Sequence, residues 1–372
     1  MRIGINARAL TKPNPAGVSR YTRKLIAALA EKEGSDTEFV LFGVNSVPDK
    51  LDAHDNVTSA GVPAPAHSGP RAHLWEQVVL PRKLGRADVD VFHTPAGQPP
   101  VLARIPLVTT IHDISPVVHP EWFSRSYAAL YRVLTPLAVR VSDRIITVSR
   151  FARDEIIDRY PQAAGKTVAV HNGLTPPPED VPIEDALPVE GIQPSEYILS
   201  VGSMNPRKNL RRLVDAYGRY RKRVADPASL TLVGPTKRVF ADAAFEPGEG
   251  VQTLGFVSDE ELGWLYRNAA TFAFPSLYEG FGLPILEAMS AGAPVVTSDR
   301  GAMAEVAGDA ACLVDPTDID SIAEGLERTL SNTTYRDRLV QRGRERAKMF
   351  TWDRTARQTA AVYKSAAREV KR

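Results

Sequence analysis

Two glutamates and two adjacent cations are the side chains of this sequence whose types and spacing could do chemistry. Glu279 and Glu287 lie in FPSLYEGFGLPILEAMSAGAPVV, where a glycine-rich turn leads into a helical pattern. Arg207 and Lys208 lie in YILSVGSMNPRKNLRRLVDAY, directly before another helical pattern. Cations at a helix start are unfavourable by up to about 1 kcal/mol unless an anion offsets them, and carboxylates accept hydrogen bonds from hydroxyl groups. The two segments therefore predict a site for a diphosphate and a sugar.

Each of these residues also has a plainer structural interpretation. Arg207 and Lys208 can be two solvated surface cations at the start of a helix. Glu287 can simply complement the positive end of a helix dipole. Glu279 fits that explanation poorly, because it precedes the glycine-rich turn and does not lie in the helix. The local patterns alone leave both interpretations open.

The elements that must position these residues have the rhythm of an α/β fold. Short apolar runs alternate with helical patterns along the chain, which predicts doubly wound parallel sheets. Strands are predicted at residues 38–44, 89–93, 107–111, 144–148, 197–202, 230–234, 252–255, 271–275 and 294–297. Helices are predicted over residues 21–30 and from Leu210, Asp259, Pro284 and Asp320. Because open α/β sheets bind ligands beyond the carboxyl ends of their strands, we expect Glu279 and Glu287 to face such a crevice, and Arg207 and Lys208 follow a strand that ends at Gly202.

A proline-rich stretch divides the chain. The 372 residues suit about two domains, and residues 174–194 contain six prolines without periodicity, as an extended connection does. We place an N-terminal domain at residues 1–174, a linker at 175–195, a C-terminal domain at 196–351 and a last helix at 352–372. That helix could pack back across the interface between the domains.

Composition excludes several classes of protein. The formal net charge of +2 gives little support to nucleic-acid binding, which needs a concentrated basic face. Residues 1–174 hold 21 Lys and Arg against 16 Asp and Glu, which leaves 25 against 28 for the rest, so the first half is the more basic. The one cysteine, Cys312, excludes an internal disulfide and fits a reducing compartment, so we expect a cytoplasmic protein. The opening MRIGINARAL lacks the apolar run of a signal peptide and predicts a buried strand.

The sequence resembles the retaining glycosyltransferases of family 4. The family marker is a pair of glutamates separated by seven residues, and Glu279 and Glu287 have that spacing. The resemblance extends through GSMNPRKN, TLGFVSDEEL, TIHDISPVVHPEWF and VSRF, and it covers nearly the whole chain. HD followed by PEWF is most similar to mannosyltransferase-type members that build surface polysaccharides or lipid-linked glycans. The resemblance implies the GT-B architecture, in which two Rossmann-like domains face a central cleft.

The resemblance also assigns roles to residues. Arg207 and Lys208 are expected at the diphosphate of the donor, Glu287 at its ribose hydroxyls, and Glu279 at the transferred sugar. His112, from the first domain, is expected to reach the donor sugar across the cleft. Other donor-binding positions are the loop glycines Gly17 and Gly202, the amides of Gly280, Phe281, Gly282 and Leu283, and the base-reading backbone of Gly255, Phe256 and Val257. Family members often carry a second glycine beside the position of Gly17, where this chain has Ala16.

The implied reaction transfers a hexose from a nucleotide diphosphate sugar to a glycan or lipid-linked acceptor. Mannose is the first expectation for the sugar and GDP-mannose for the donor, with no cofactor. Anomeric configuration is retained, and the leaving phosphate takes the acceptor's proton. Arg207 and Lys208 stand in for a metal, so none is expected.

Short metal-like patterns elsewhere do not change that expectation. Asp88 with Asp90, and Asp318 with Asp320, match the Asp-x-Asp pattern of a different glycosyltransferase fold, but three-residue matches are common by chance. The seven histidines have no HxH or HxxxH spacing. His93 has no supporting motif and is expected to be structural or to line the acceptor site.

Two other functions remain compatible with the residues. A non-catalytic protein that binds a nucleotide sugar or a glycan could share this fold. A nucleotide-sugar epimerase or dehydrogenase shares parts of the architecture, but the glycine fingerprint of a dinucleotide site is incomplete, since Ile285 stands at its third position.

Aromatic and basic residues of the first half could form a peripheral membrane surface. The aromatic residues are Trp75, Trp122 and Phe123, and the basic ones are Arg71, Arg82, Lys83, Arg86 and Arg125. Core packing is the alternative for the aromatic side chains.

Overall fold

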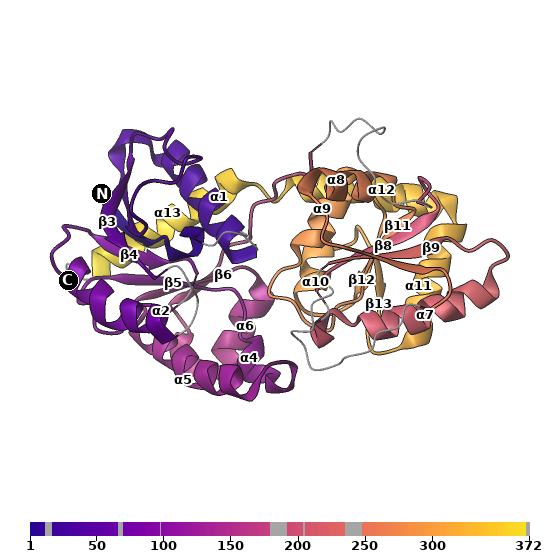
Figure 1. Ribbon diagram of the computed structural model, residues 1–372, viewed down its shortest axis with the longest axis horizontal. Coiled ribbons are helices and arrows are strands. Elements are labelled where there is room, and N and C mark those ends of the chain that lie inside the picture. Colours follow the sequence, from indigo (N-terminus) through magenta and orange to yellow (C-terminus); the bar gives the residue numbers. More distant parts are fainter. Residues whose placement is uncertain are drawn as a thin grey trace. The chain divides into compact units, whose positions relative to one another are not determined.

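A computed structural model describes residues 1–11, 17–65, 70–96, 98–178, 192–203, 205–234 and 248–369. The chain forms two compact units (Figure 1). Unit 1 comprises Met1–Val118, Arg125–Gly173 and Thr351–Arg372, and unit 2 comprises His119–Ser124 and Leu174–Phe350. Most of the predicted linker, residues 179–191, lies outside the described residues.

Unit 1 is built on a parallel sheet in the order β3-β2-β1-β4-β5-β6-β7. Its strands are β1 (Arg2–Asn6), β2 (Glu38–Gly43), β3 (Val57–Pro63), β4 (Val91–Thr94), β5 (Leu107–Ile111), β6 (Arg144–Thr147) and β7 (Thr167–Ala169). Its helices are α1 (Gly17–Glu33), α2 (Pro70–Leu74), α3 (Leu80–Leu84), α4 (Ser115–Val118), α5 (Arg125–Val141), α6 (Arg150–Arg159) and α13 (Trp352–Glu369). A π-helix, η3 (Trp75–Val79), joins α2 to α3.

Alternating apolar side chains give the sheet of unit 1 two buried faces. Phe39 and Leu41 of β2 pack with α1 and α13, whereas Val40 and Phe42 pack with Trp75 and the residues of α3. The C-terminal helix α13 thus lies beside α1 in the core of the first unit (Figure 1). This pattern is the reason that the strand sequences are apolar throughout.

Unit 2 repeats the architecture with the order β10-β9-β8-β11-β12-β13. Its strands are β8 (Tyr197–Val201), β9 (Ser229–Val233), β10 (Val251–Gly255), β11 (Thr271–Phe274), β12 (Val295–Ser298) and β13 (Cys312–Val314). Its helices are α7 (Leu210–Arg223), α8 (Asp259–Asn268), α9 (Leu283–Ala291), α10 (Gly301–Ala307), α11 (Ile319–Ser331) and α12 (Thr333–Lys348).

The two faces of the second sheet are covered by different helices. Ala273 of β11 packs in the cluster formed with α7 and α11, while Phe272 meets Tyr266 of α8 with their ring centroids 5.3 Å apart. Strands therefore run through the middle of unit 2 with helices on both sides (Figure 1). The chain order reverses direction between β8 and β11, which makes their carboxyl ends the topological switch point of this sheet.

Candidate functional site

The loops that follow β8 and β11 meet at this switch point of unit 2. The first loop carries Arg207 and Lys208 in the 3-10 turn η6 (Pro206–Lys208), and the second carries Glu279. Lys208 Nζ lies 2.6 Å from Glu279 Oε1, and an Arg207 guanidinium nitrogen lies 3.5 Å from Glu279 Oε2. The structure thus brings together three of the predicted residues from loops about 70 residues apart in sequence.

The cluster brings two cations and one carboxylate together in a largely closed environment. The side chains of Lys208 and Glu279 are only 12% and 9% exposed, and two cations face one carboxylate. The Lys208 ammonium also lies 4.6 Å from the ring centroid of Phe274, a cation–π contact that partly replaces its lost hydration. Because charges interact more strongly away from water, an anion that reached these two cations would be attracted to them strongly.

Backbone and amide contacts fix the two loops to each other. Leu277 N donates to Arg207 O at 2.7 Å, and Asn205 accepts from Arg207 N at 3.0 Å. Asn209 Nδ2 donates to the carbonyls of Pro275 and Pro316 at 2.9 and 2.6 Å. Asn209 directly precedes α7, but its side chain makes no capping bond to that helix and instead ties three loops together.

Two glycines let the first loop approach its neighbours closely. A Cβ on Gly202 would lie 3.3 Å from Cδ of Lys208, so a larger residue would press on the stem of that cation. A Cβ on Gly234, at φ +149°, would overlap the Gly202 carbonyl. The absence of a side chain at Gly202 therefore leaves room for the stem of Lys208 and also permits the backbone turn.

The glycine-rich turn leads directly from Glu279 into α9. Gly280 and Phe281 are buried, Gly282 adopts φ +108°, and Leu283 is the first helical residue. Pro284 occupies the first turn of α9, where the absent N–H costs nothing. The turn presents the start of a helix beside the cluster of cations, which suits an anionic or hydroxyl-bearing ligand.

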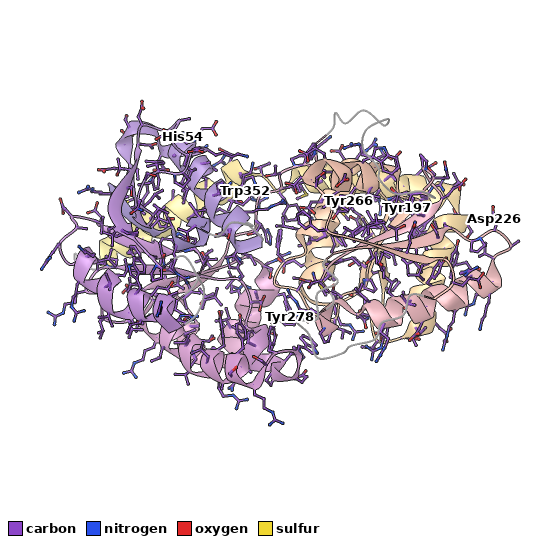
Figure 2. The ribbon with its side chains drawn as sticks, viewed as in Figure 1. His54, Tyr197, Asp226, Tyr266, Tyr278 and Trp352 are labelled. Atoms are coloured by element: carbon purple, nitrogen blue, oxygen red, sulfur yellow. The ribbon has the colours of Figure 1, made fainter. Side chains whose placement is uncertain are left out.

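Glu287 lies one turn further along α9 and has a different partner. Tyr266 of α8, which is labelled in Figure 2, donates to Glu287 Oε2 at 3.1 Å. Burial, and next the charge of Glu287, raise the pKa of Tyr266 well above its usual value, so the phenol stays protonated and can donate. Glu287 itself is half-buried.

The predicted base-reading segment follows β10. Gly255 ends the strand at φ +68°, and its carbonyl accepts from Gly234 N at 2.8 Å. Phe256 is 89% exposed, and the half-buried Val257 precedes Ser258, which forms a capping box with Glu261 at the start of α8. The capped start of α8 therefore lies directly after the exposed ring of Phe256, and packing does not explain the position of that ring.

Comparisons with known proteins identify the family. Residues 15–176 match the model described as Glycosyltransferase Family 4, and residues 183–346 match Glycosyl transferases group 1. The chain is 34% identical to O-antigen chain mannosyltransferase B of Escherichia coli, covering 94% of this chain and 96% of that protein. It is 31% identical to the MMP alpha-(1->4)-mannosyltransferase of Mycolicibacterium hassiacum, covering 95% and 89%. The chain belongs to glycosyltransferase family 4.

Solved structures agree with this assignment at the level of the fold. Sucrose-phosphate synthase from Thermosynechococcus elongatus superposes with a TM-score of 0.73 at 21% identity over 98% of both chains. Anabaena HepE, solved in complex with UDP-glucose, gives a TM-score of 0.63 at 20% identity over 97% of this chain and 99% of that one. The GT-B fold expected from sequence is confirmed, and the protein is a glycosyltransferase.

The remaining predicted residues of the glycosyltransferase lie in unit 1. His112 follows β5, and its Nε2 lies 2.9 Å from the carbonyl of Pro95, while the ring of Tyr21 meets it edge-on with centroids 4.8 Å apart. Burial lowers the pKa of His112, so it is neutral at pH 7. Nε2 must then carry the proton, which leaves Nδ1 as a hydrogen-bond acceptor.

His93 and Gly17 have clear local environments. His93 is buried between Tyr363 of α13 and Thr110, whose oxygens lie 2.7 and 2.8 Å from its two nitrogens, so it belongs to the core of unit 1. A Cβ on Gly17 would meet no atom of the described residues within 4 Å, so their packing does not require glycine there. Ala16 lies outside the described residues.

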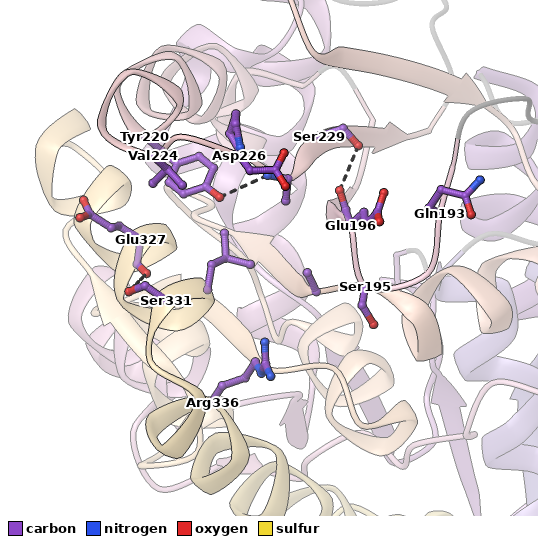
Figure 3. A pocket seen from close by; sticks show the side chains of 14 residues that line it. Gln193, Ser195, Glu196, Tyr220, Val224, Asp226, Ser229, Glu327, Ser331 and Arg336 are labelled. Carbon is purple, nitrogen blue, oxygen red and sulfur yellow. Dashed lines mark hydrogen bonds between the residues drawn. The ribbon is translucent and has the colours of Figure 1, made fainter.

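One described pocket of the glycosyltransferase lies away from this site. A cavity of about 450 Å³ opens beside Ser195, Glu196 and Ser229, at the amino ends of β8 and β9 (Figure 3). It contains none of the predicted site residues. Because α/β sheets bind ligands beyond their carboxyl ends, this pocket is not part of the predicted donor site.

Sequence reasoning missed three supporting residues. Asn209 holds the loops together, Phe274 underlies the ammonium of Lys208, and Tyr266 fixes Glu287. Only Asn209 gave a recognisable signal in the sequence, because asparagine tolerates the left-handed region of the backbone. In the structure it adopts φ +61°.

Proposed function

We propose that this glycosyltransferase transfers mannose from GDP-mannose to a hydroxyl of a glycan or lipid-linked acceptor, with retained configuration and without a metal ion. Two relatives matched over nearly their whole length are named mannosyltransferases, which supports mannose over glucose as the transferred sugar. Open α/β sheets bind ligands beyond the carboxyl ends of their strands, which supports a donor site at that edge of unit 2.

The observation that carries the proposal is the convergence of Arg207 and Lys208 on Glu279. A nucleotide diphosphate leaving group develops negative charge as the sugar departs, and fixed cations beside it lower the barrier. Arg207 and Lys208 take the diphosphate, with amides of Gly280 to Leu283 beside them. Glu279 accepts hydrogen bonds from hydroxyls of the mannose.

The remaining donor contacts follow the same logic. Glu287, held by Tyr266, accepts from the ribose hydroxyls. The backbone of Gly255 to Val257 reads the base, and the exposed ring of Phe256 offers it a stacking plane. His112 supplies a neutral acceptor, Nδ1, for a hydroxyl of the transferred sugar, and Gly17 leaves open space for a phosphate or the acceptor.

The proposed step is a front-face substitution. The bond between the anomeric carbon and the diphosphate oxygen breaks, and the acceptor oxygen forms a new bond to the same face of that carbon. The acceptor's proton passes to the departing phosphate oxygen, so no protein nucleophile is needed. The cations stabilise the diphosphate throughout this exchange.

The test measures transfer from GDP-mannose, UDP-glucose and ADP-glucose to a panel of mannosides and lipid-linked oligosaccharides. We expect turnover with GDP-mannose, α-configured products by NMR, and activity that survives a chelator. Selective turnover of another donor would contradict the assignment to mannose. A β-configured product would contradict retention of configuration. Loss of activity with EDTA that Mg²⁺ restores would contradict metal independence.

A further inference from the structure

Helix α5 of unit 1 carries an apolar stripe that faces solvent. The stripe consists of Tyr127, Leu130, Val133 and Leu137, whose side chains belong to residues that are 37–58% exposed. Their spacing of three or four positions places them on one side of a helix. Surface apolar residues are usually scattered, so four in one row need an explanation.

Packing of α5 does not provide that explanation. Its buried residues, Ala128, Thr135, Ala138 and Val139, lie on the other side of the helix. Val139 packs in the cluster with Ile145 and Ile156 under the sheet. The helix is thus anchored by its other side, and within the stripe the ring of Tyr127 contacts that of Tyr131, with centroids 4.6 Å apart.

The charges beside the stripe have a single sign. The sequence of α5, RSYAALYRVLTPLAVRV, contains Arg125, Arg132 and Arg140 and no acidic residue. All three arginines are exposed, and none forms an ion pair with any other residue that the structure describes. Unsatisfied cations beside an apolar row attract an anionic, partly apolar surface.

The neighbouring helical segment continues this character. Val141, at the end of α5, packs against the cluster that contains Leu80 and Leu84 of α3. Just before α3, Leu74 and Val79 are 62% and 37% exposed. The same segment carries the basic residues Arg71, Arg82, Lys83 and Arg86. Two adjacent elements of unit 1 therefore combine exposed apolar side chains with an excess of cations.

We propose that the stripe of α5 docks on an anionic lipid bilayer, with the helix lying in the plane of the interface. Apolar side chains enter the headgroup boundary while the arginines contact lipid phosphates. A second copy of the chain is a poorer occupant, because pairing two stripes would bring six arginines together. Among the described residues no helix is long and apolar enough to cross a membrane, so the contact is peripheral.

This surface differs from the one expected from sequence. Trp75 is only 5% exposed and packs in the core beside α3, so it is not available to lipid. Trp122 and Phe123 belong to unit 2. The proposal rests on the surface of α5, supported by the neighbouring segment around α3, and does not depend on the identity of the donor.

The experiment is vesicle flotation of the full chain. Vesicles of phosphatidylcholine with about one quarter phosphatidylglycerol are compared with pure phosphatidylcholine. The Leu130→Glu/Val133→Glu variant should bind the anionic vesicles about tenfold more weakly than wild type. Val168→Glu is the control, because Val168 is 41% exposed on β7 of the same unit and lies outside the stripe.

Arginine variants and the oligomeric state of the protein distinguish docking on lipid from pairing of two chains. Arg132→Ala/Arg140→Ala should weaken binding to anionic vesicles, with donor turnover on a water-soluble acceptor and the melting temperature unchanged. Equal flotation of wild type and both double variants would overturn the proposal. It would also be overturned if wild type were a dimer in solution that Leu130→Glu/Val133→Glu converts to a monomer without any change in flotation.

Discussion

Lys208 brings a positive charge into a part of unit 2 that water reaches poorly. Glu279 stabilises that charge when no other anion is near, since its carboxylate lies 2.6 Å from the ammonium. A diphosphate would compete for the same cations and release Glu279 to accept hydrogen bonds from hydroxyls. The proposed donor site therefore predicts that the ion pair exchanges partners on binding, and each partner can be tested separately.

Removing Lys208 should reduce transfer strongly. Lys208→Ala is expected to lower kcat by about 10²–10³, the usual cost of removing one fixed donor from a developing negative charge. Steady-state kinetics with saturating donor measures this effect. Arg211→Ala, which removes an exposed cation from the first turn of α7, is the matched control and should keep wild-type activity. Equal losses of activity in both variants would mean that the overall positive potential of this region, and not the position of Lys208, supports transfer.

Neutralising Glu279 should separate binding from transfer. Glu279→Gln keeps the side-chain volume but stops the carboxylate from competing for Arg207 and Lys208, so we expect GDP to bind as tightly as in wild type or more tightly. Transfer should fall by about 10²-fold, because the contact to the sugar is weakened. Isothermal titration with GDP and a transfer assay give the two quantities. Weaker GDP binding would show that Glu279 positions the cations and does not compete with the diphosphate.

At the scale of elements, the site depends on loops that side chains hold together. Asn209 is in the left-handed region at φ +61°, and its amide donates to the carbonyls of Pro275 and Pro316. A buried pair of carbonyls that loses its donor is costly, at about 1–3 kcal/mol. The geometry of the cations is thus linked to the stability of unit 2.

Two substitutions at Asn209 should distinguish the amide from the backbone strain. Asn209→Gly permits the same φ and removes only the hydrogen bonds, so we expect a loss of about 1–3 kcal/mol in the free energy of unfolding, with weaker donor binding. Asn209→Ala should lower the free energy of unfolding by about 1 kcal/mol more, because alanine disfavours the left-handed region. Urea unfolding measures both. Equal stability of the glycine variant and wild type would contradict the role of the amide.

Much of the fold was predictable because buried parallel strands are apolar along their whole length. Each of the nine predicted strands lies on a strand of the sheets, with ends displaced by at most two residues, and α7 and α8 begin at the predicted Leu210 and Asp259. Three edge strands, β3, β7 and β13, gave no distinct pattern. Edge strands have fewer apolar positions, so their sequences resemble loops.

The site was predictable in its residue types but not in its contacts. The segment around Arg207 and the segment around Glu279 each had a recognisable turn, and strand order then placed them together. The tyrosine that holds Glu287 comes from α8, and no local spacing in the sequence links Tyr266 to Glu287. Contacts between elements depend on packing, which periodicity within one element does not encode.

At the scale of the whole molecule, stability should depend on pH through His93. Burial, and next the charge of His112, lower its pKa from 6.5 to about 3. Between these values the unfolded chain binds a proton that the folded chain does not, so stability is complete above pH 6.5 and is lost as pH falls toward 3.

Replacing His93 should flatten this dependence. His93→Gln is expected to be less stable than wild type at pH 7 but to lose less free energy of unfolding between pH 6.5 and pH 4, by up to about 1.4 kcal/mol per pH unit. Urea titrations at several pH values measure the slope. An unchanged slope in the variant would assign the dependence to other groups.

The central claim is that one activated sugar is held by Arg207 and Lys208 at its diphosphate and by Glu279 and Glu287 at its hydroxyls. A crystal structure of the protein with an intact nucleotide sugar tests it most directly. We predict diphosphate oxygens within about 3 Å of both cations, a sugar hydroxyl on Glu279 and ribose on Glu287. A donor bound elsewhere, with Lys208 still paired to Glu279, would contradict the account.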